Sequence, residues 1–178
     1  YFGVAPDATL YAYQTSTSST RSAGTCASGG EQLDTIGKLI NQAVEDGAQI
    51  ISISQSIHAS DELKWAVTNA TAHGVIIVGS AGNKSIDDNS KHMGQYSGVV
   101  GVSAIDTTGN FASYSSWGNG VVTAAVGGPF DSFNPNTNAP GRSEGTSTSA
   151  AMVAGMLALA RQKWPEATTN QILQLLVH

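Results

Sequence analysis

The pattern of hydrophobic and polar residues predicts alternating helices and strands through the middle of the chain. Apolar residues recur every three or four positions between residues 31 and 46, as on one face of an amphipathic helix: Leu33, Ile36, Ile40 and Val44. Residues 50–54 are mostly β-branched and apolar, as in a strand, and residues 61–73 repeat the helical spacing. Gly47 and Gly74 stand where these two helices should end.

Continuous apolar runs at 75–78, 99–105 and 121–126 predict three further strands. A strand, a helix and a second strand within about thirty residues imply parallel pairing with a crossover helix. The predicted fold class is therefore α/β, with a mostly parallel sheet flanked by helices. A turn and a short alternating strand are also expected at the start of the chain, up to Tyr13.

The most apolar stretch lies near the end of the sequence. Residues 148–160 include no charged side chain, which predicts a helix that is hydrophobic on all sides and buried. Ser147 comes directly before this stretch. A helix start carries unpaired N–H groups and a partial positive charge, so Ser147 is interpreted either as an N-cap or as a nucleophile beside a site that stabilises an anion.

The remaining segments are irregular. Residues 15–30, 84–95 and 127–141 are polar or rich in glycine and proline, which predicts loops. A short terminal helix is expected from the apolar side formed by Ile172, Leu175 and Leu176. No internal repeat or linker divides the chain, so residues 1–178 are predicted to belong to one domain.

Composition narrows the classes of function. With 40% hydrophobic and only 12% charged residues, the chain is expected to be globular rather than disordered. The net charge is −5 and the eight basic residues are scattered, which argues against a nucleic-acid partner. No apolar stretch reaches the ~20 residues that a membrane span needs. The single cysteine, Cys26, cannot form an internal disulfide and is interpreted as an inert thiol.

The segment Gly145-Thr146-Ser147, followed by Val153-Ala154-Gly155, resembles the nucleophile segment of the subtilisin-like serine proteases. Four other segments match this family in the same order: Gly3-Val4-Ala5-Pro6, Ser54-Gln55-Ser56, Ser80-Ala81-Gly82-Asn83 and the residues 111–118. One difference is clear. The family usually continues Gly-Thr-Ser with Met-Ala-Ser-Pro-His, whereas this chain has Thr148-Ser149-Ala150-Ala151-Met152.

The resemblance implies a role for each matching residue. Ser147 would be the nucleophile of an endopeptidase, and the side-chain amide of Asn83 would stabilise the oxyanion together with the backbone N–H of Ser147. The substrate backbone would pair with Ser54, Gln55 and Ser56, and one wall of the specificity pocket would be formed by Ser80, Ala81 and Gly82. Lys91 lies near the expected pocket floor, where it either selects acidic side chains or points into solvent.

The same resemblance implies that part of the machinery is missing. The family's catalytic aspartate and histidine both precede the segment that begins at Gly3, and none of the four histidines of this chain stands in the family's His-Gly-Thr-His setting: His58, His73, His92 and His178. The chain is therefore expected to be an N-terminally incomplete, subtilisin-like peptidase domain that is inactive in isolation. The alternative is a catalytically dead relative that serves as a binding or structural module.

A third interpretation is a small α/β ligand-binding domain in which Ser147 only caps an anion site. No glycine-rich phosphate loop follows any predicted strand, which weighs against it. No cofactor is expected. Calcium is common in the family, but Asp87, Asp88 and Asp131 are scattered and no metal site is assigned. The implied partners are a polypeptide substrate and an upstream segment or propeptide of the same protein, which would be secreted or at the cell surface.

Overall fold

Four parallel strands form the centre of the structure, a computed structural model that describes residues 3–15, 34–57, 59–87, 91–133 and 139–177. They lie in sequence order and each pairs in parallel with the next: β1 (Ile50–Ile53), β2 (Ile76–Ser80), β3 (Val100–Ile105) and β4 (Val121–Val126). The predicted α/β class with a mostly parallel sheet is confirmed.

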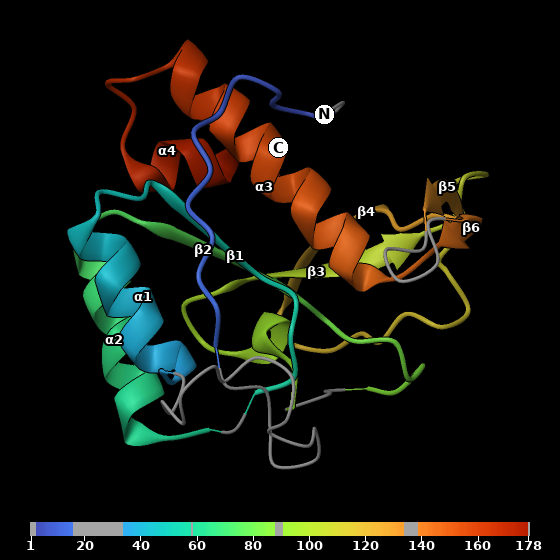
Figure 1. Cartoon of the computed structure of the whole chain (residues 1–178), viewed down its shortest axis with the longest axis horizontal. Helices are drawn as coiled ribbons and strands as arrows, with labels where there is room; N and C mark the ends of the chain where they lie inside the picture. Colours follow the sequence, from blue (N-terminus) through green and yellow to red (C-terminus); the bar gives the residue numbers. More distant parts are fainter. Residues whose placement is uncertain (1–2, 16–33, 58, 88–90, 134–138, 178) are drawn as a thin grey trace.

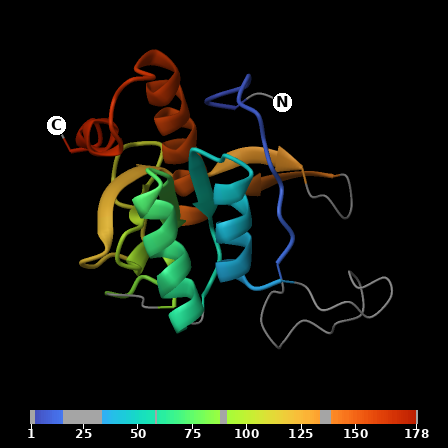
Figure 2. The same ribbon diagram turned by 90° about the vertical axis from the view of Figure 1, so that its left-hand side faces the viewer.

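Helices cover both faces of this sheet, as Figures 1 and 2 show. On one face lie α1 (Ile36–Glu45) and α2 (Asp61–Ala72), and on the other lies α3 (Thr146–Lys163). Side chains of β2 alternate between them, because successive residues of a strand point to opposite faces. Ile77 packs in the cluster under α1 and α2, whereas Ile76 and Val78 pack with α3.

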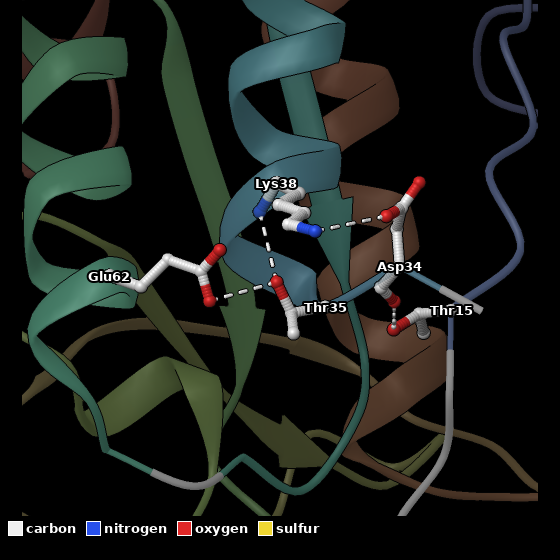
Figure 3. Close-up of polar contacts among 5 residues, drawn as sticks. All are labelled: Thr15, Asp34, Thr35, Lys38 and Glu62. Atoms are coloured by element: carbon white, nitrogen blue, oxygen red, sulfur yellow. Dashed lines mark hydrogen bonds and ion pairs between the residues drawn. The ribbon is translucent and has the colours of Figure 1, made fainter. Parts of the chain in front are cut away.

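The two helices on the first face are joined at their N-terminal ends. Thr35 is the N-cap of α1, since its hydroxyl accepts a hydrogen bond from the N–H of Lys38, and it donates to the carboxylate of Glu62 in the first turn of α2 (Figure 3). A Cβ on Gly37 would lie 3.0 Å from Cγ of Glu62, so the helices approach closely here. The predicted helix is confirmed over 36–45; its expected first residues, 31–33, lie outside the described residues.

The predicted strand before Tyr13 is wrong. Residues 9–15 run without strand pairing on the β1 side of the sheet, anchored where the Tyr13 hydroxyl donates to Asp46 at the end of α1 (2.5 Å). That bond raises the pKa of Tyr13 to about 12. A strand needs a neighbouring strand to receive its backbone hydrogen bonds. Among the described residues, β1 pairs only with β2, and nothing pairs with this segment.

The expectation that α3 is buried on all sides is also wrong. The sheet covers one side of the helix, so Leu157 is 1% exposed. Its opposite side is open, with Met156 at 51% and Leu159 at 42% exposure. The apolar sequence predicts burial, but the described residues cover the side away from the sheet only in part, at Gly155, where a Cβ would lie 2.9 Å from Cβ of Val4.

The predicted 127–141 loop contains part of a hairpin. β5 (Phe130–Phe133) and β6 (Pro140–Ser143) pair antiparallel, and residues 134–138 between them lie outside the described residues. A 3-10 turn, η1 (Met93–Gln95), interrupts the 84–95 loop. The terminal helix is confirmed as α4 (Thr169–Gln174), in which Ile172 is buried, but it ends before Leu175 and Leu176, and Leu175 is 50% exposed. No helix in the described part of the chain is both long and apolar enough to cross a bilayer.

Candidate active site

The ends of two neighbouring strands meet the beginning of α3. Ser54 follows β1, and its hydroxyl donates to the backbone carbonyl of Ser147 (3.3 Å). Gly82 follows β2, and its N–H donates to the hydroxyl of Thr146 (3.1 Å). The carboxyl ends of parallel strands share one edge of a sheet, which is where such folds bind ligands. Here that edge also holds the N-terminus of an 18-residue helix.

Ser147 is the second residue of α3 and its side chain is exposed. The N-cap is Gly145, with no side-chain cap, so the interpretation of Ser147 as an N-cap is wrong. Helix geometry leaves the first N–H groups without intrahelical acceptors. The N–H groups of Thr148 and Ser149 bond to the carbonyl of Gly145, and that of Thr146 bonds to Asn83. The N–H of Ser147 has no acceptor among the described residues.

Asn83 is held by two hydrogen bonds on one side of its amide. Its Oδ1 accepts from the N–H (2.9 Å) and from the hydroxyl (2.8 Å) of Thr146. The same hydroxyl accepts a hydrogen bond from the N–H of Gly82, so consecutive hydrogen bonds connect Gly82, Thr146 and Asn83. Because Oδ1 is occupied by these donors, Nδ2 is left beside the start of α3 as a donor with no acceptor among the described residues.

Gly145 makes this close approach possible. Its φ of 152° and ψ of 159° belong to a region that only glycine adopts readily. A Cβ at this position would lie 3.0 Å from Nδ2 of Asn83. The N–H of Gly145 donates to the carbonyl of Gly127 (2.8 Å), which fixes the turn into the helix. A side chain here would therefore disturb both the turn and the amide.

The other predicted substrate-binding residues differ in exposure. Ser80 and Ala81 are fully buried, and the N–H of Ala81 donates to the carbonyl of Val102 in β3. Their side chains therefore belong to the core. Gln55 is half-buried and Ser56 is exposed. The roles of these residues and of Gly82 in substrate binding stay predictions.

Ser56 forms an antiparallel β-bridge with His92, and its hydroxyl lies 3.4 Å from Nε2 of that ring. Burial, followed by the positive charge of Lys84, lowers the pKa of His92. The imidazole is therefore uncharged at neutral pH. His92 is half-buried and its Nδ1 has no partner within the described part of the chain.

No base reaches Ser147 from the described residues. Besides His92, the structure describes His73, whose Nδ1 lies 2.8 Å from the carbonyl of Asn69 in its own helix. His58 and His178 lie outside the described residues. The site therefore offers an exposed hydroxyl and two free N–H donors, a set that stabilises an oxyanion but does not by itself activate the serine.

Sequence reasoning missed the residues that hold the start of α3. Thr146 is fully buried and orients Asn83. Ser149 is also buried and donates to the carbonyl of Ala125 in β4 (2.9 Å). The Tyr114 hydroxyl donates to the carbonyl of Gly127 (3.1 Å). Thr146 belongs to the Gly-Thr-Ser motif, so the sequence could have indicated its importance. The contacts of Ser149 with Ala125 and of Tyr114 with Gly127 have no sequence motif that would predict them.

Metal ligands do not gather in the described part of the chain. No group of three or more histidine, cysteine or acidic residues there is arranged to hold a metal ion. Asp87 and Asp131 are both exposed, and Asp88 lies outside the described residues. Calcium binding in a longer parent protein stays a prediction.

Comparison with known proteins identifies relatives along the whole chain. The family model described as "Subtilase family" matches residues 1–178. A thermostable alkaline protease of Halalkalibacterium halodurans is 33% identical over 97% of the chain, which spans 45% of that relative. Subtilisin DY of Bacillus licheniformis is 32% identical over 96% of the chain, which spans 60% of it. The chain thus covers about half the length of these relatives.

Solved structures give the same result for the fold. The self-cleaved protease domain of PatA superposes with a TM-score of 0.68 and 28% identity, over 78% of this chain and 56% of that one. A cold-adapted subtilisin-like serine proteinase superposes with a TM-score of 0.68 over 78% of this chain and 51% of its own; at 24% identity this likeness concerns the fold alone. With a family model that matches from the first residue to the last, this chain belongs to the subtilase family.

Proposed function

We propose that this chain is the C-terminal part of the catalytic domain of a serine endopeptidase, with Ser147 as its nucleophile. The observation that carries the proposal is the pair of free donors beside the exposed Ser147 hydroxyl: its own N–H and Nδ2 of Asn83. Such donors are useful where a carbonyl oxygen becomes negatively charged. The N-terminus of α3 adds favourable electrostatic potential at the same point.

In this mechanism, Oγ of Ser147 attacks the carbonyl carbon of the scissile peptide bond while a base takes its proton. The carbonyl oxygen becomes an oxyanion and accepts hydrogen bonds from Asn83 and from the N–H of Ser147. The C–N bond then breaks, the proton passes to the leaving amine, and an acyl-enzyme remains on Ser147. Water then attacks the ester carbonyl while the same base takes its proton, and the base passes that proton to Oγ of Ser147 as the ester C–O bond breaks.

The base and its orienting acid are proposed to come from a segment upstream of this chain. The described histidines contact Asn69 and Ser56, not Ser147. Within the described residues, β1 pairs with no strand other than β2, and Met156 and Leu159 of α3 are exposed, so this edge and this helix side give such a segment surfaces to pack against. The 178-residue chain alone is therefore expected to have little or no peptidase activity.

The substrate is proposed to be a polypeptide that pairs with Ser54, Gln55 and Ser56 as an added strand. The backbone of Ser80, Ala81 and Gly82 would form one wall of the pocket that receives its side chain. Relatives are named as alkaline proteases and subtilisins, which supports a polypeptide substrate. By family resemblance, the parent protein is also proposed to be secreted or at the cell surface and to have its upstream segment or a propeptide as a partner.

Labelling of the parent protein with a fluorophosphonate tests this function. We expect covalent modification of Ser147, located by peptide mass spectrometry and abolished in Ser147→Ala. Ser113→Ala is the matched control, because Ser113 is also an exposed serine but lies outside the site. A folded parent protein that remains unlabelled would instead favour the catalytically dead binding module.

A further inference from the structure

A pocket of about 440 Å³ lies where β1 and β2 begin, at the end of the sheet opposite the candidate active site. Gln49 and Val75, the residues that precede these two strands, line it. Ser54 and Gly82 follow the other ends of the same strands and contact the start of α3, whereas Arg161 in the last turn of α3 lines this pocket. The pocket is therefore separate from the candidate active site.

The guanidinium of Arg161 is held in place by this chain, but its donors are not all used. Its Nη1 donates to the carbonyl of Ala167 (3.0 Å), and its Nη2 donates to the carbonyl of Gly74 (2.9 Å) and to the hydroxyl of Thr169 (2.7 Å). A guanidinium has five N–H donors, so one donor on Nη1 and the donor on Nε remain. Nε is buried and has no acceptor in the described part of the chain.

The positive charge of Arg161 also lacks a counter-ion among the described residues. The salt bridges found there involve three other cations: Lys38, Lys64 and Arg142. Asp46, which directly precedes the wall of the pocket in sequence, accepts hydrogen bonds from the Tyr13 hydroxyl and the Gln42 amide instead. Arginine stays charged at physiological pH, and a half-buried charge without a partner costs free energy. The pocket therefore favours an anion.

The other walls of the pocket limit the kind of anion. Val44, Ala48 and Val75 supply apolar surface, and no acidic residue is among the described residues that line the pocket. His73 also lines it, and the ring is held by the 2.8 Å contact of its Nδ1 with the carbonyl of Asn69. The volume is within the range of pockets that bind small molecules. One cation beside apolar walls suits a ligand with a single negative charge and a small apolar body.

We propose that this pocket binds a small aliphatic carboxylate, whose charged group accepts a hydrogen bond from Arg161 and whose alkyl part packs against Val44 and Ala48. A carboxylate balances the charge of the guanidinium, and hydrogen bonds between charged groups are stronger than those between neutral groups. Inorganic phosphate would supply the charge but no apolar part. The same chemistry occurs in free short-chain acids and at the C-terminus of a peptide that ends in leucine. The site does not involve Ser147, so the inference is independent of the proposed function.

An NMR titration of the parent protein tests the inference, with Ser147→Ala introduced to exclude self-digestion. The probe 4-methylpentanoate is compared with 4-methylpentanamide, which has nearly the same shape but no charge. We expect the acid to shift the backbone amide signals of Gly47, Gly74 and Thr169, with a Kd of about 1 mM for a ligand of this size. The amide should bind about tenfold more weakly, because it lacks the charge-assisted hydrogen bond to Arg161.

Variants assign the binding to this pocket. Arg161→Gln removes the charge and should weaken binding of the acid about tenfold or more. Because it also breaks three hydrogen bonds and could unfold the protein, Ala48→Leu is the second variant: it adds volume at the wall, leaves the guanidinium in place and should weaken binding similarly. The matched control is Lys163→Gln, which removes a cation that lies over Trp164 in the same turn of α3 and should not change the Kd. Circular dichroism of each variant checks that the fold is retained.

Each outcome supports or overturns the inference. Binding of the acid that exceeds that of the amide and is lost in Ala48→Leu or in folded Arg161→Gln supports it. Equal binding of acid and amide overturns it, because the charge of Arg161 then contributes nothing. Absence of binding, or binding of the acid that persists in both variants, also overturns it. N-acetyl-leucine, which adds an acetylated amino group to the same acid, distinguishes the sources: tighter binding than that of 4-methylpentanoate indicates a peptide C-terminus, and weaker binding indicates a free acid.

Discussion

Two halves of the candidate site are built differently. On the oxyanion side, Thr146 joins Gly82 and Asn83, which are 64 and 63 positions away in the sequence, through bonds of 2.8 to 3.1 Å. Thr146 is completely buried. On the substrate side, Ser54 and Ser56 make contacts of 3.3 and 3.4 Å, and Ser56 is exposed. The first half is rigidly held by this chain alone, whereas the second is held weakly.

The difference follows from what each half would have to do. Donors that stabilise a developing charge are most effective when they are already in place, because no reorganisation is then needed during the reaction. A substrate-binding edge can instead be completed by the peptide backbone that it pairs with. The comparison therefore predicts that substitutions on the oxyanion side affect kcat and that those on the substrate side affect binding or stability.

The largest expected effect is that of Asn83→Ala in the active parent protein. We expect kcat to fall by about 10²- to 10³-fold, which is the range known for the loss of such a donor in subtilisin itself. Steady-state kinetics with a peptide substrate measures it. KM should change little, because the donor acts on the oxyanion and not on the ground-state carbonyl. A rise in KM at unchanged kcat would contradict the assigned role.

Gly145→Ala tests how tightly the oxyanion side is built. The residue has a φ of 152° and a new Cβ would lie 3.0 Å from Nδ2 of Asn83, so we expect the free energy of unfolding to fall by about 1–3 kcal/mol. Displacement of the amide should lower kcat as well. Urea unfolding and steady-state kinetics measure the two effects.

Gly109→Ala is the matched control for this substitution. Gly109 also has a positive φ, of 88°, but a Cβ there would meet no atom within 4 Å. It should cost about 1 kcal/mol of stability through backbone strain alone and leave kcat unchanged. Equal kinetic behaviour of the two variants would show that the contact with Asn83 has no catalytic consequence.

Thr146→Val is expected to have a smaller effect, of about tenfold in kcat, since it removes the two hydrogen bonds made by one hydroxyl. The role proposed for Thr146 is to orient Asn83. A double-mutant cycle therefore distinguishes orientation from a general loss of structure: in the Asn83→Ala background, Thr146→Val should reduce kcat no further. Additive losses in kcat would show that Thr146 acts independently of the amide.

The sequence predicts a feature of this molecule correctly when the residues that determine the feature lie close together in the chain. The spacing of Ile36, Ile40 and Val44 and the apolar runs of β2 and β3 are local, and they predict the helices and the parallel sheet correctly. The early strand up to Tyr13 is predicted wrongly because an extended segment becomes a strand only when its backbone pairs with another strand, and residues 9–15 pair with none of the described strands. The burial of α3 is overestimated for a related reason, because an apolar helix side is buried only where another part of the molecule packs against it.

In the candidate site, too, sequence reasoning identifies single residues but does not predict their contacts with residues distant in the chain. A motif places Asn83 and Ser147 at the end of a strand and the start of a helix, and the structure brings these two segments together through Thr146. That Asn83 turns its Oδ1 toward Thr146 depends on contacts across 63 positions of sequence, which no periodicity encodes. His92 beside Ser56 was missed for the same reason.

The smallest expected effect concerns the substrate side, where Ser56 contacts His92, and the pH dependence of the free energy of unfolding. Burial and then the charge of Lys84 lower the pKa of His92 below its ordinary value of 6.5, while Lys91 adjoins it and the exposed Asp87 lies on the same loop. Between the folded and the unfolded pKa, the unfolded chain binds more protons. Stability from neutral His92 is therefore fully present above about pH 6.5 and is lost as the pH falls through the folded pKa.

His92→Asn should remove this component and so flatten the loss of stability on acidification. Urea unfolding of the parent protein at about pH 8, 6.5 and 5 measures it. The His92 variant should lose less stability between the two lower pH values than the wild type. An unchanged pH profile in His92→Asn would mean that the ring is solvated and that the contact with Ser56 does not hold the substrate side of the site in place.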